Sequence, residues 1–317
     1  MYIAKIGIYG IMKKTKGGKE VRTEDWIKQN AASLAGKRVA ISGSTGGIGR
    51  VLCEHLASLG VKQLILLDRD GRRMLRHRFA LLQKYPHLHV GEIHMDLSDM
   101  ESVRYAAKCL EKQPIDVLIC NAGAYAVPRF ITSSGLDNVF QINFAAPYYL
   151  LRRLTPHLAQ RGGRVVLVGS VAHRYSLTDP DDVDFRTREK ASLVYGNAKR
   201  YLMIAAPEAA AKAGLPLAMT HPGITVTGIT AHYPKWLYAL IKYPMKVIFM
   251  HPRRACLSIL QGVYTDTQPG EWIGPRLFDV WGLPKKSRYD TYSAEEKARV
   301  CAEAERIYQM LAEEGTE

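Results

Sequence analysis

The stretch "RVAISGSTGGIG", residues 38–49, joins a short apolar run to four closely spaced glycines. The run "RVAIS" is nearly continuous in apolar residues, as strands buried on both faces of a sheet are. Gly43 permits a tight turn, Gly47 lets the backbone approach a pyrophosphate, and Gly49 allows close contact between helix and strand. A helix N-terminus after such a turn attracts anions. We therefore predict a dinucleotide-binding loop, whose contact residues are Gly43, Ser44, Thr45, Gly47, Ile48 and Gly49.

The rest of the chain continues this alternation of strand and helix. Apolar runs typical of strands recur at 63–67, 88–95, 115–120, 164–170 and 216–221. Segments of helical length lie at 50–59, 72–84, 99–112, 138–160 and 193–213. The order implies right-handed β-α-β crossovers, so we expect an α/β fold with one doubly wound parallel sheet of about seven strands, flanked by helices. The run "RLFDVWG" at 276–282 is the candidate for the seventh strand.

Three segments surround or interrupt this core, which we place at residues 37–290. Residues 1–36 form an N-terminal extension, and residues 228–254 form a helical insertion after the sixth strand. Residues 291–317 form a C-terminal helix, opened by a capping box of Ser293 and Glu296. An apolar stripe on this helix should pack on the body or on a partner; it consists of Val300, Ala304, Ile307 and Leu311.

The composition is that of a globular protein, with 317 residues of which 47% are hydrophobic and 23% charged. No apolar run reaches the roughly 18 residues that a membrane-spanning helix needs, and the N-terminus lacks a signal-peptide pattern. Five cysteines without a Cys-x-x-Cys pair argue against a disulfide framework or a zinc site. They favour a reducing compartment, so we expect a cytoplasmic protein without a metal centre.

The net charge of +14 is concentrated in two segments. Residues 1–38 hold nine Lys/Arg against three Asp/Glu, and residues 228–254 hold five Lys/Arg and no acid. Together they supply a net charge of +11 out of the +14 of the whole chain. Because no nucleic-acid reader motif accompanies this charge, we expect no nucleic-acid partner. The basic, aromatic-bearing flanks suggest peripheral contact with an anionic membrane; the alternative is ordinary solvated lysines.

The insertion at 228–254 follows the carboxyl end of a strand, where doubly wound sheets bind ligands. Several apolar residues suit a lid over an apolar substrate: Trp236, Leu237, Leu240, Ile241, Ile248 and Phe249. Three lysines would meet lipid phosphates at the same time: Lys235, Lys242 and Lys246. The alternative is a helical hairpin that only covers the core.

An acidic residue, Asp68, stands 19 residues beyond Gly49 at the end of the second predicted strand. A carboxylate there accepts hydrogen bonds from the adenosine ribose and repels a 2′-phosphate, which favours NAD(H). Arg69, the next residue, could instead bind that phosphate, so NADP(H) is the alternative cofactor.

Six further motifs, together with the glycine loop, resemble the short-chain dehydrogenase/reductase family over residues 37 to about 228. In chain order they are "MDLSD" (95–99), "CNAG" (120–123), "FQIN" (140–143), "GRVVLVGS" (163–170), "YGNAK" (195–199) and "HPGITVT" (221–227). The Ser-x-Ala-His run at 170–173 and the acidic stretch after it are similar to the retinol and steroid dehydrogenase branch.

The resemblance implies a catalytic set consisting of Asn143, Ser170, Tyr195 and Lys199. Of three Tyr-x-x-x-Lys pairs in the chain, only Tyr195–Lys199 follows a matched serine strand. Tyr195 would exchange a proton with the substrate oxygen, and the Lys199 ammonium would lower the tyrosine pKa from about 10. Ser170 would fix the substrate oxygen, and Asn143 would hold a water linked to the lysine.

The same resemblance assigns further cofactor contacts to the ends of the other strands. These residues are Asp96, Leu97, Asn121, Ala122, Gly123, Pro222, Gly223, Ile224 and Thr227, beside Tyr195 and Lys199 themselves. His173 and His221 are expected to be structural. Pro207 should kink the helix that often carries the family's dimer face, which disfavours the usual dimer.

We therefore expect an oxidoreductase that transfers a hydride between a nicotinamide cofactor and a secondary alcohol or ketone. The substrate would be bulky and apolar, such as a steroid or a retinoid-like alcohol. One alternative is an NADP(H)-dependent carbonyl reductase of the same fold. Another is a non-catalytic nucleotide-binding protein at a membrane surface.

Overall fold

The computed structural model describes residues 22–225, 250–289 and 292–313. The chain divides into two compact units, Met1–Asn30 and Ala31–Glu317. In the first, helix α2 (Thr23–Asn30) has Glu24 and Asp25 in its first turn, where acids favour a helix. The second unit contains the sheet and the candidate site.

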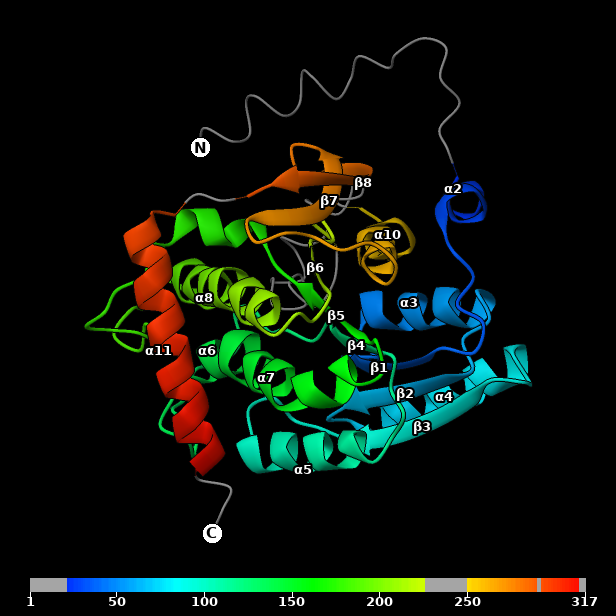
Figure 1. The fold of residues 1–317 in the computed structure, drawn as a ribbon, viewed down its shortest axis with the longest axis horizontal. Helices are drawn as coiled ribbons and strands as arrows, with labels where there is room; N and C mark the ends of the chain where they lie inside the picture. The colour runs from blue at the N-terminus through cyan, green and yellow to red at the C-terminus, as the bar shows by residue number, and fades with distance from the viewer. Residues whose placement is uncertain (1–21, 226–249, 290–291, 314–317) are drawn as a thin grey trace, which may run out of the picture. The chain divides into compact units, whose positions relative to one another are not determined.

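The second unit is built on one eight-stranded sheet with the order β3-β2-β1-β4-β5-β6-β7-β8 (Figure 1). The strands are β1 (Arg38–Ser42), β2 (Gln63–Asp68), β3 (His89–His94), β4 (Val117–Cys120), β5 (Arg164–Val168), β6 (Leu217–Thr220), β7 (Glu271–Leu277) and β8 (Trp281–Arg288). All neighbours are parallel except β8, which pairs antiparallel with β7. The strand order reverses between β1 and β4, so a ligand crevice is expected at their carboxyl ends. This confirms the predicted fold class.

Helices cover both faces of the sheet (Figure 1). On one face lie α3 (Gly47–Ser58), α4 (Gly71–Lys84) and α10 (Pro252–Gly262); on the other lie α5 (Met100–Glu111), α7 (Ala146–Ala159) and α8 (Ala191–Lys212). Because both faces are covered, β4 and β6 are buried at every residue. That burial is the physical cause of the continuous apolar runs in the sequence.

The predicted seventh strand at 276–282 is wrong. The seventh strand, β7, begins at Glu271, and the run at 276–282 spans its end, a tight turn and the start of β8. Phe278 and Asp279 have positive φ in that turn, and the Phe278 side chain is 91% exposed. The apolar run therefore marks a hairpin tip. Strand β8 lacks an apolar pattern because it is an edge strand, where Pro284 and lysines are tolerated.

The predicted helix at 138–160 consists of three consecutive pieces. They are α6 (Asn138–Phe140), a π-helical turn η1 (Gln141–Ala145) and α7. Such π turns inside helices are frequent at functional sites. Asn143 lies in the middle of this one.

Helix α8 continues through Pro207 to Lys212, so this proline does not end the helix. A proline at 207 leaves the carbonyl of Met203, four residues earlier, without its helical N–H donor. The Tyr289 hydroxyl donates a hydrogen bond of 2.6 Å to that carbonyl. A contact from outside the helix therefore compensates for the proline.

The C-terminal helix α11 (Ala294–Glu313) packs across α7 and α8 (Figure 1). Its predicted stripe is buried at all four positions. The predicted cap is also present, because the Ser293 hydroxyl accepts from the Glu296 backbone N–H at 3.0 Å. Ion pairs Arg152–Glu305 and Lys297–Glu208 flank the stripe. Helix α11 thus covers the outer surface of α7 and α8.

Candidate active site

The glycine loop between β1 and α3 has the close packing that its sequence predicts. Gly43 has φ of +65°, and a Cβ there would lie 2.9 Å from the Ala122 Cα. A Cβ on Gly49 would lie 2.1 Å from the Gly43 carbonyl oxygen. Any side chain at these two positions would force the first turn of α3 away from β1 and from the loop after β4.

The loop fits the pyrophosphate of a dinucleotide. Helix α3 begins at Gly47, and neither a capping side chain nor an acidic residue occupies its first turn. Its N-terminal N–H groups and positive dipole end can therefore receive an anion. The Ser44 hydroxyl, in the same loop, is buried and has no hydrogen-bond partner among the described residues. An oxygen of a bound phosphate would satisfy it.

At the carboxyl end of β2, Asp68 faces the same loop. Its Oδ2 accepts from the Thr45 N–H at 3.1 Å and from the Thr45 hydroxyl at 2.8 Å. Arg73, on the first turn of α4, donates to the Thr45 carbonyl at 2.9 Å. Sequence reasoning missed Arg73, although its place three residues after the helix cap Asp70 was a usable signal. The Asp96 Oδ1 accepts two hydrogen bonds from Ser98, one from its N–H at 2.9 Å and one from its hydroxyl at 2.7 Å.

The segment after β4 is held between the glycine loop and Asn143. The Asn121 side chain donates to the Ser42 carbonyl at 3.0 Å, and the Ala122 N–H donates to the Ser42 hydroxyl at 3.0 Å. Asn143 accepts from the Ala124 N–H at 3.2 Å and donates to the Ala124 carbonyl at 2.8 Å. It also donates to the Val139 carbonyl at 2.8 Å. One side-chain donor and the Oδ1 of Asn143 therefore fix this segment, while the other donor binds the Val139 carbonyl in the helix that carries Asn143.

The structure brings the four predicted catalytic residues together. Ser170 follows β5, and Tyr195 and Lys199 lie one turn apart on α8, with the ammonium 5.8 Å from the tyrosine ring centroid. The Lys199 ammonium donates to the Val168 carbonyl at 2.8 Å. A Cβ on Gly123 would lie 2.8 Å from the Asn143 Oδ1 and 3.7 Å from the lysine nitrogen. A side chain at position 123 would thus collide with the Asn143 amide.

The remaining predicted contacts lie after β6. Pro222 and Gly223 form a turn with the glycine at φ +78°, and the Ile224 N–H donates to the Val280 carbonyl at 3.4 Å. Thr225 pairs with Met250 across the insertion. Thr227 and the insertion up to residue 249, including the proposed lid residues, lie outside the described residues.

Comparison with known proteins decides the family. The short chain dehydrogenase model matches residues 37–179. A Streptomyces protein named for daunorubicin C-13 ketoreduction is 33% identical over 200 residues, covering 62% of this chain and 68% of that protein. Human retinol dehydrogenase 13 is 28% identical over 229 residues, or 69% of each chain. The chain belongs to the short-chain dehydrogenase family. It is an NAD(P)-dependent oxidoreductase, and these relatives support the retinol dehydrogenase branch.

Solved structures agree on the fold. A protein from Mycobacterium paratuberculosis matches with a TM-score of 0.70 and 25% identity, over 92% of this chain and 98% of that chain. The NADPH-dependent 3-quinuclidinone reductase from Rhodotorula rubra matches with a TM-score of 0.58 and 20% identity, over 81% and 95%. The second likeness shows a shared fold alone.

The pKa values in this short-chain dehydrogenase differ from the sequence-based expectation. Burial raises the pKa of Tyr195 to about 12, while a hydrogen bond with Ser170 acts in the opposite direction. Burial also lowers the pKa of Lys199 to about 8. In the protein alone, desolvation thus outweighs any stabilisation of the phenolate by the lysine, whose ammonium is directed to the Val168 carbonyl.

Both histidines near the strand ends are packed inside the dehydrogenase, as expected for structural residues. The His173 Nδ1 lies 2.6 Å from the Ser170 carbonyl, and its ring meets Trp272 edge-on at 5.6 Å. The His221 ring stacks on Trp272 at 4.9 Å. Burial lowers the pKa of both, to about 3 for His221, so both are neutral at pH 7.

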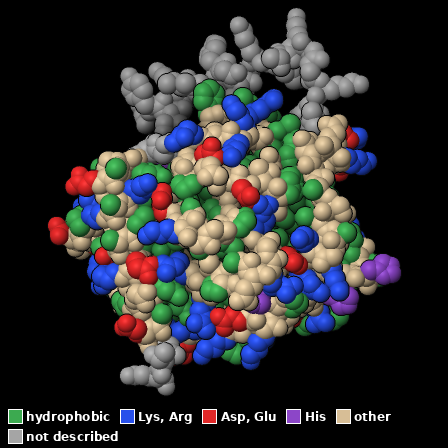
Figure 2. Space-filling view, in the orientation of Figure 1, with side chains coloured by type: hydrophobic (Ala, Val, Ile, Leu, Met, Phe, Trp, Pro, Cys, Tyr) green, Lys and Arg blue, Asp and Glu red, His purple; other side chains and the backbone are tan. Residues whose placement is uncertain are grey.

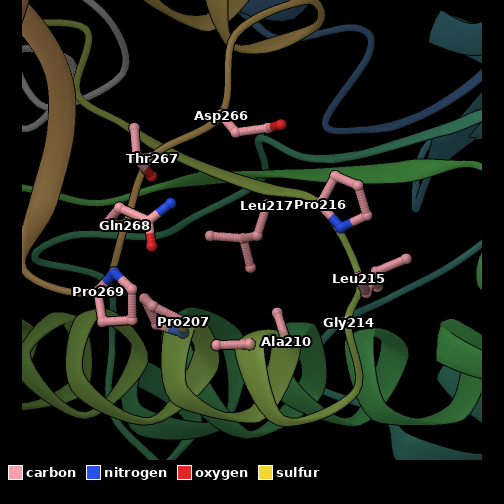
Figure 3. A pocket seen from close by; sticks show the side chains of 11 residues that line it. Pro207, Ala210, Gly214, Leu215, Pro216, Leu217, Asp266, Thr267, Gln268 and Pro269 are labelled. Atoms are coloured by element: carbon pink, nitrogen blue, oxygen red, sulfur yellow. The ribbon is translucent and has the colours of Figure 1, made fainter.

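A cavity in the dehydrogenase lies away from the predicted catalytic residues. A cavity of about 190 Å³ opens beside Pro207, Leu217 and Gln268 (Figure 3). It lies at the amino end of β6, whereas Ser170 lies beyond the carboxyl end of β5. Within the described ranges, no cluster of three or more His, Cys, Asp or Glu side chains is placed to hold a metal ion.

Proposed function

We propose that this dehydrogenase transfers a hydride between a nicotinamide cofactor and a bulky, apolar substrate, either a secondary alcohol or ketone such as a steroid, or a retinoid-like alcohol. The observation that carries the proposal is the placement of Tyr195 one turn before the buried Lys199 on α8, with the ammonium 5.8 Å from the tyrosine ring centroid and the Ser170 side chain close enough to lower the pKa of the tyrosine. A protein that only sensed nucleotides would not need this arrangement.

The residues divide the chemistry as follows. The crevice would hold a nicotinamide, which would supply or accept the hydride and would carry a positive charge when oxidised. Tyr195 exchanges the proton: its oxygen takes the hydroxyl proton of an alcohol during oxidation and returns one to the carbonyl oxygen during reduction. Ser170 donates to the same substrate oxygen and holds it next to Tyr195. A positive charge bound beside the tyrosine would lower its pKa from about 12 towards neutrality.

Asn143 and Lys199 support this exchange. Asn143 fixes the segment at Ala124 through one side-chain donor and its Oδ1, and its other donor binds the Val139 carbonyl. Its role is therefore to brace the crevice wall rather than to hold a water through its amide. Lys199 lies within one turn of Tyr195 and is buried, with a pKa of about 8. It is therefore close to the pH at which it can release or take up a proton, and it would bind the nicotinamide ribose.

The apolar substrate class is supported by exposed side chains near the catalytic serine. Tyr175 and Leu177 follow Ser170 within eight residues and are 58% and 75% exposed. Arg174 pairs with Asp279 at 2.9 Å, which brings the hairpin tip with the exposed Phe278 to the same segment. The names of two relatives, for retinol and daunorubicin, also refer to bulky compounds.

For the cofactor, we propose NAD(H). Thr45 binds one oxygen of Asp68 and thereby orients the carboxylate, while the other oxygen has only a long contact, 3.4 Å, to the Asp70 N–H. That oxygen can accept from a ribose hydroxyl. Arg69 and Arg73 favour the alternative, NADP(H), which several solved structures of the same fold carry.

We also propose peripheral contact with anionic membranes through the two basic flanks, in a protein of the cytoplasm. On the face shown in Figure 2, basic and acidic side chains are interspersed, so the charge excess is not concentrated there. Among the described helices, none is long and apolar enough to cross a membrane. The partner surface would be lipid headgroups.

The experiment that tests the proposed activity is a panel of apolar alcohols and ketones assayed with NAD(H) and NADP(H), following nicotinamide absorbance. Turnover of bulky secondary alcohols or ketones, and weaker turnover of small ones, is expected. Turnover restricted to small polar substrates would overturn the substrate class.

A further inference from the structure

A buried ion pair connects the C-terminal helix to the residue after the catalytic lysine. Arg200 follows Lys199 on α8, and its side chain is 3% exposed. Its Nε and Nη2 donate to the two Glu296 carboxylate oxygens, each at 2.6 Å. This is the bidentate geometry in which arginine–carboxylate pairs are strongest and most directional. Glu296 lies in the first turn of α11.

The same guanidinium also holds the turn that begins at the catalytic serine. Arg200 Nη1 donates to the His173 carbonyl at 3.1 Å. His173 belongs to the short turn η2 (Val171–Tyr175), and its Nδ1 lies 2.6 Å from the Ser170 carbonyl. Since that oxygen can only accept, the neutral ring carries its proton on Nδ1 and donates it to Ser170.

Glu296 contacts the next part of this segment as well. Its Oε1 accepts from the Thr178 hydroxyl at 3.0 Å. Arg200 and Glu296 therefore hold the segment 170–178 at two points, one close to the serine and one beyond η2. The chain of contacts runs from α11 through Arg200 and His173 to Ser170.

We propose that the Glu296–Arg200 pair is a positioning element for the hydride-transfer site. By holding the His173 turn, α11 fixes the Ser170 hydroxyl against Tyr195. This inference rests on the proposed function. Misplacing a reacting group by about 1 Å can cost on the order of 10²-fold in rate, so a small shift of the serine turn is sufficient to matter. Neither residue touches the substrate in this scheme.

The chain offers a matched control for this pair. Arg152–Glu305 also joins α11 to the body, on α7, and has no contact with the serine turn among its hydrogen bonds. Glu296→Gln and Glu305→Gln each remove one carboxylate charge from the same helix. Because Arg200 is 3% exposed and Arg152 27%, a role restricted to docking α11 predicts a larger loss of stability for Glu296→Gln, but no faster exchange confined to residues 170–178.

The test compares steady-state kinetics and hydrogen–deuterium exchange for these two variants and for His173→Phe, which keeps the aromatic packing. For Glu296→Gln we expect kcat to fall at least tenfold, with KM and cofactor affinity within twofold, and faster exchange in residues 170–178. Glu305→Gln should change each by less than twofold. His173→Phe should lower kcat similarly, and combining it with Glu296→Gln should add little, because both break one chain of contacts.

Unchanged exchange in residues 170–178 of Glu296→Gln would overturn the proposal whatever the activity. Equal kinetic effects of the two glutamine variants would overturn it too. Tyr195→Phe, assayed in parallel, separates the proposed function from this inference: if it retains full activity, the assigned chemistry fails, whereas the exchange data still decide whether Glu296 holds the serine turn.

Discussion

The Tyr289 hydroxyl donates a 2.6 Å hydrogen bond to the Met203 carbonyl, the group that Pro207 leaves without a helical donor. The sequence suggested that Pro207 would distort the helix carrying the catalytic pair. The bond explains why α8 instead remains continuous over 22 residues. Because Tyr289 is also packed on His173 and Trp272, the segment after β8 is joined to the helix that carries Tyr195.

The first prediction concerns this compensation. Tyr289→Phe should lower the free energy of unfolding by about 1–3 kcal/mol, because it leaves a buried carbonyl without a partner. Adding Pro207→Ala restores the helical N–H donor, so the double variant should recover most of the loss. Urea unfolding measures both. If the double variant is as unstable as Tyr289→Phe, the proline is not what makes this hydroxyl necessary.

The second prediction concerns the proton-exchanging group. Tyr195→Phe keeps the ring packed against Tyr125, at 5.3 Å, and removes only the hydroxyl. Hydride transfer should fall by about 10²–10⁴-fold while cofactor affinity stays nearly unchanged. Tyr9→Phe, from another Tyr-x-x-x-Lys pair, is the control and should be fully active. Activity of Tyr195→Phe within threefold of the parent would remove this residue from the mechanism.

The third prediction follows from the pKa of Lys199, which burial lowers from 10.5 to about 8. Below pH 8 the lysine is charged in both the folded and unfolded states, and burying that charge destabilises the fold. Above pH 10.5 it is neutral in both, so this cost disappears. In the parent protein, the contribution of Lys199 to the free energy of unfolding therefore rises between pH 8 and pH 10.5.

Lys199→Met should consequently raise the free energy of unfolding at pH 7, by roughly 3 kcal/mol less the lost hydrogen bond to Val168, and abolish activity. The gain should shrink as the pH approaches 10.5. Lys212→Met, at an exposed position on the same helix, should show no such dependence. Thermal melts across this pH range measure it, and a destabilised Lys199→Met at pH 7 would contradict the pKa shift.

The fourth prediction concerns cofactor choice. Asp68→Ala should weaken NADH binding and relieve the repulsion of a 2′-phosphate, with Arg69 and Arg73 then free to bind it. Loss of a charged hydrogen-bond partner is worth roughly 1.5–3 kcal/mol, so the preference should shift at least tenfold towards NADPH. Fluorescence titration with both cofactors measures this, with Asp99→Ala as the control. A parent that already prefers NADPH would refute the role given to Asp68.

The fifth prediction concerns the insertion. Replacing Trp236 and Leu240 by serine should raise KM for bulky apolar substrates far more than for small ones. Equal effects on both would contradict a lid.

Changing three lysines of the insertion to glutamate should abolish co-sedimentation with anionic vesicles; these are Lys235, Lys242 and Lys246. The same charge change at exposed helix positions Lys108, Lys112 and Lys212 should not. Sedimentation that is independent of the charge would contradict membrane contact.

The sequence by itself determined the parallel sheet and the positions of most chemical groups. Strands buried on both faces must be continuously apolar, so β1 was predicted with its observed bounds, residues 38–42. Gly43 and Gly49 could be interpreted from local sterics alone, because each lies where a Cβ would collide with backbone. The order of the motifs then placed Asn143, Ser170, Tyr195 and Lys199 at neighbouring strand and helix ends.

Only the tertiary structure decided how these groups are held. The sequence gives no sign of the structural role of Arg200, because that role depends on its hydrogen bonds to Glu296, which lies 96 residues away in the chain. The same holds for Tyr289 and Met203, 86 residues apart. The edge hairpin was missed because an edge strand buries little and so needs no apolar pattern. Periodicity reports local burial, whereas hydrogen bonds between distant segments, and the desolvation that raises the pKa of Tyr195 to about 12, depend on the packed arrangement of the whole domain.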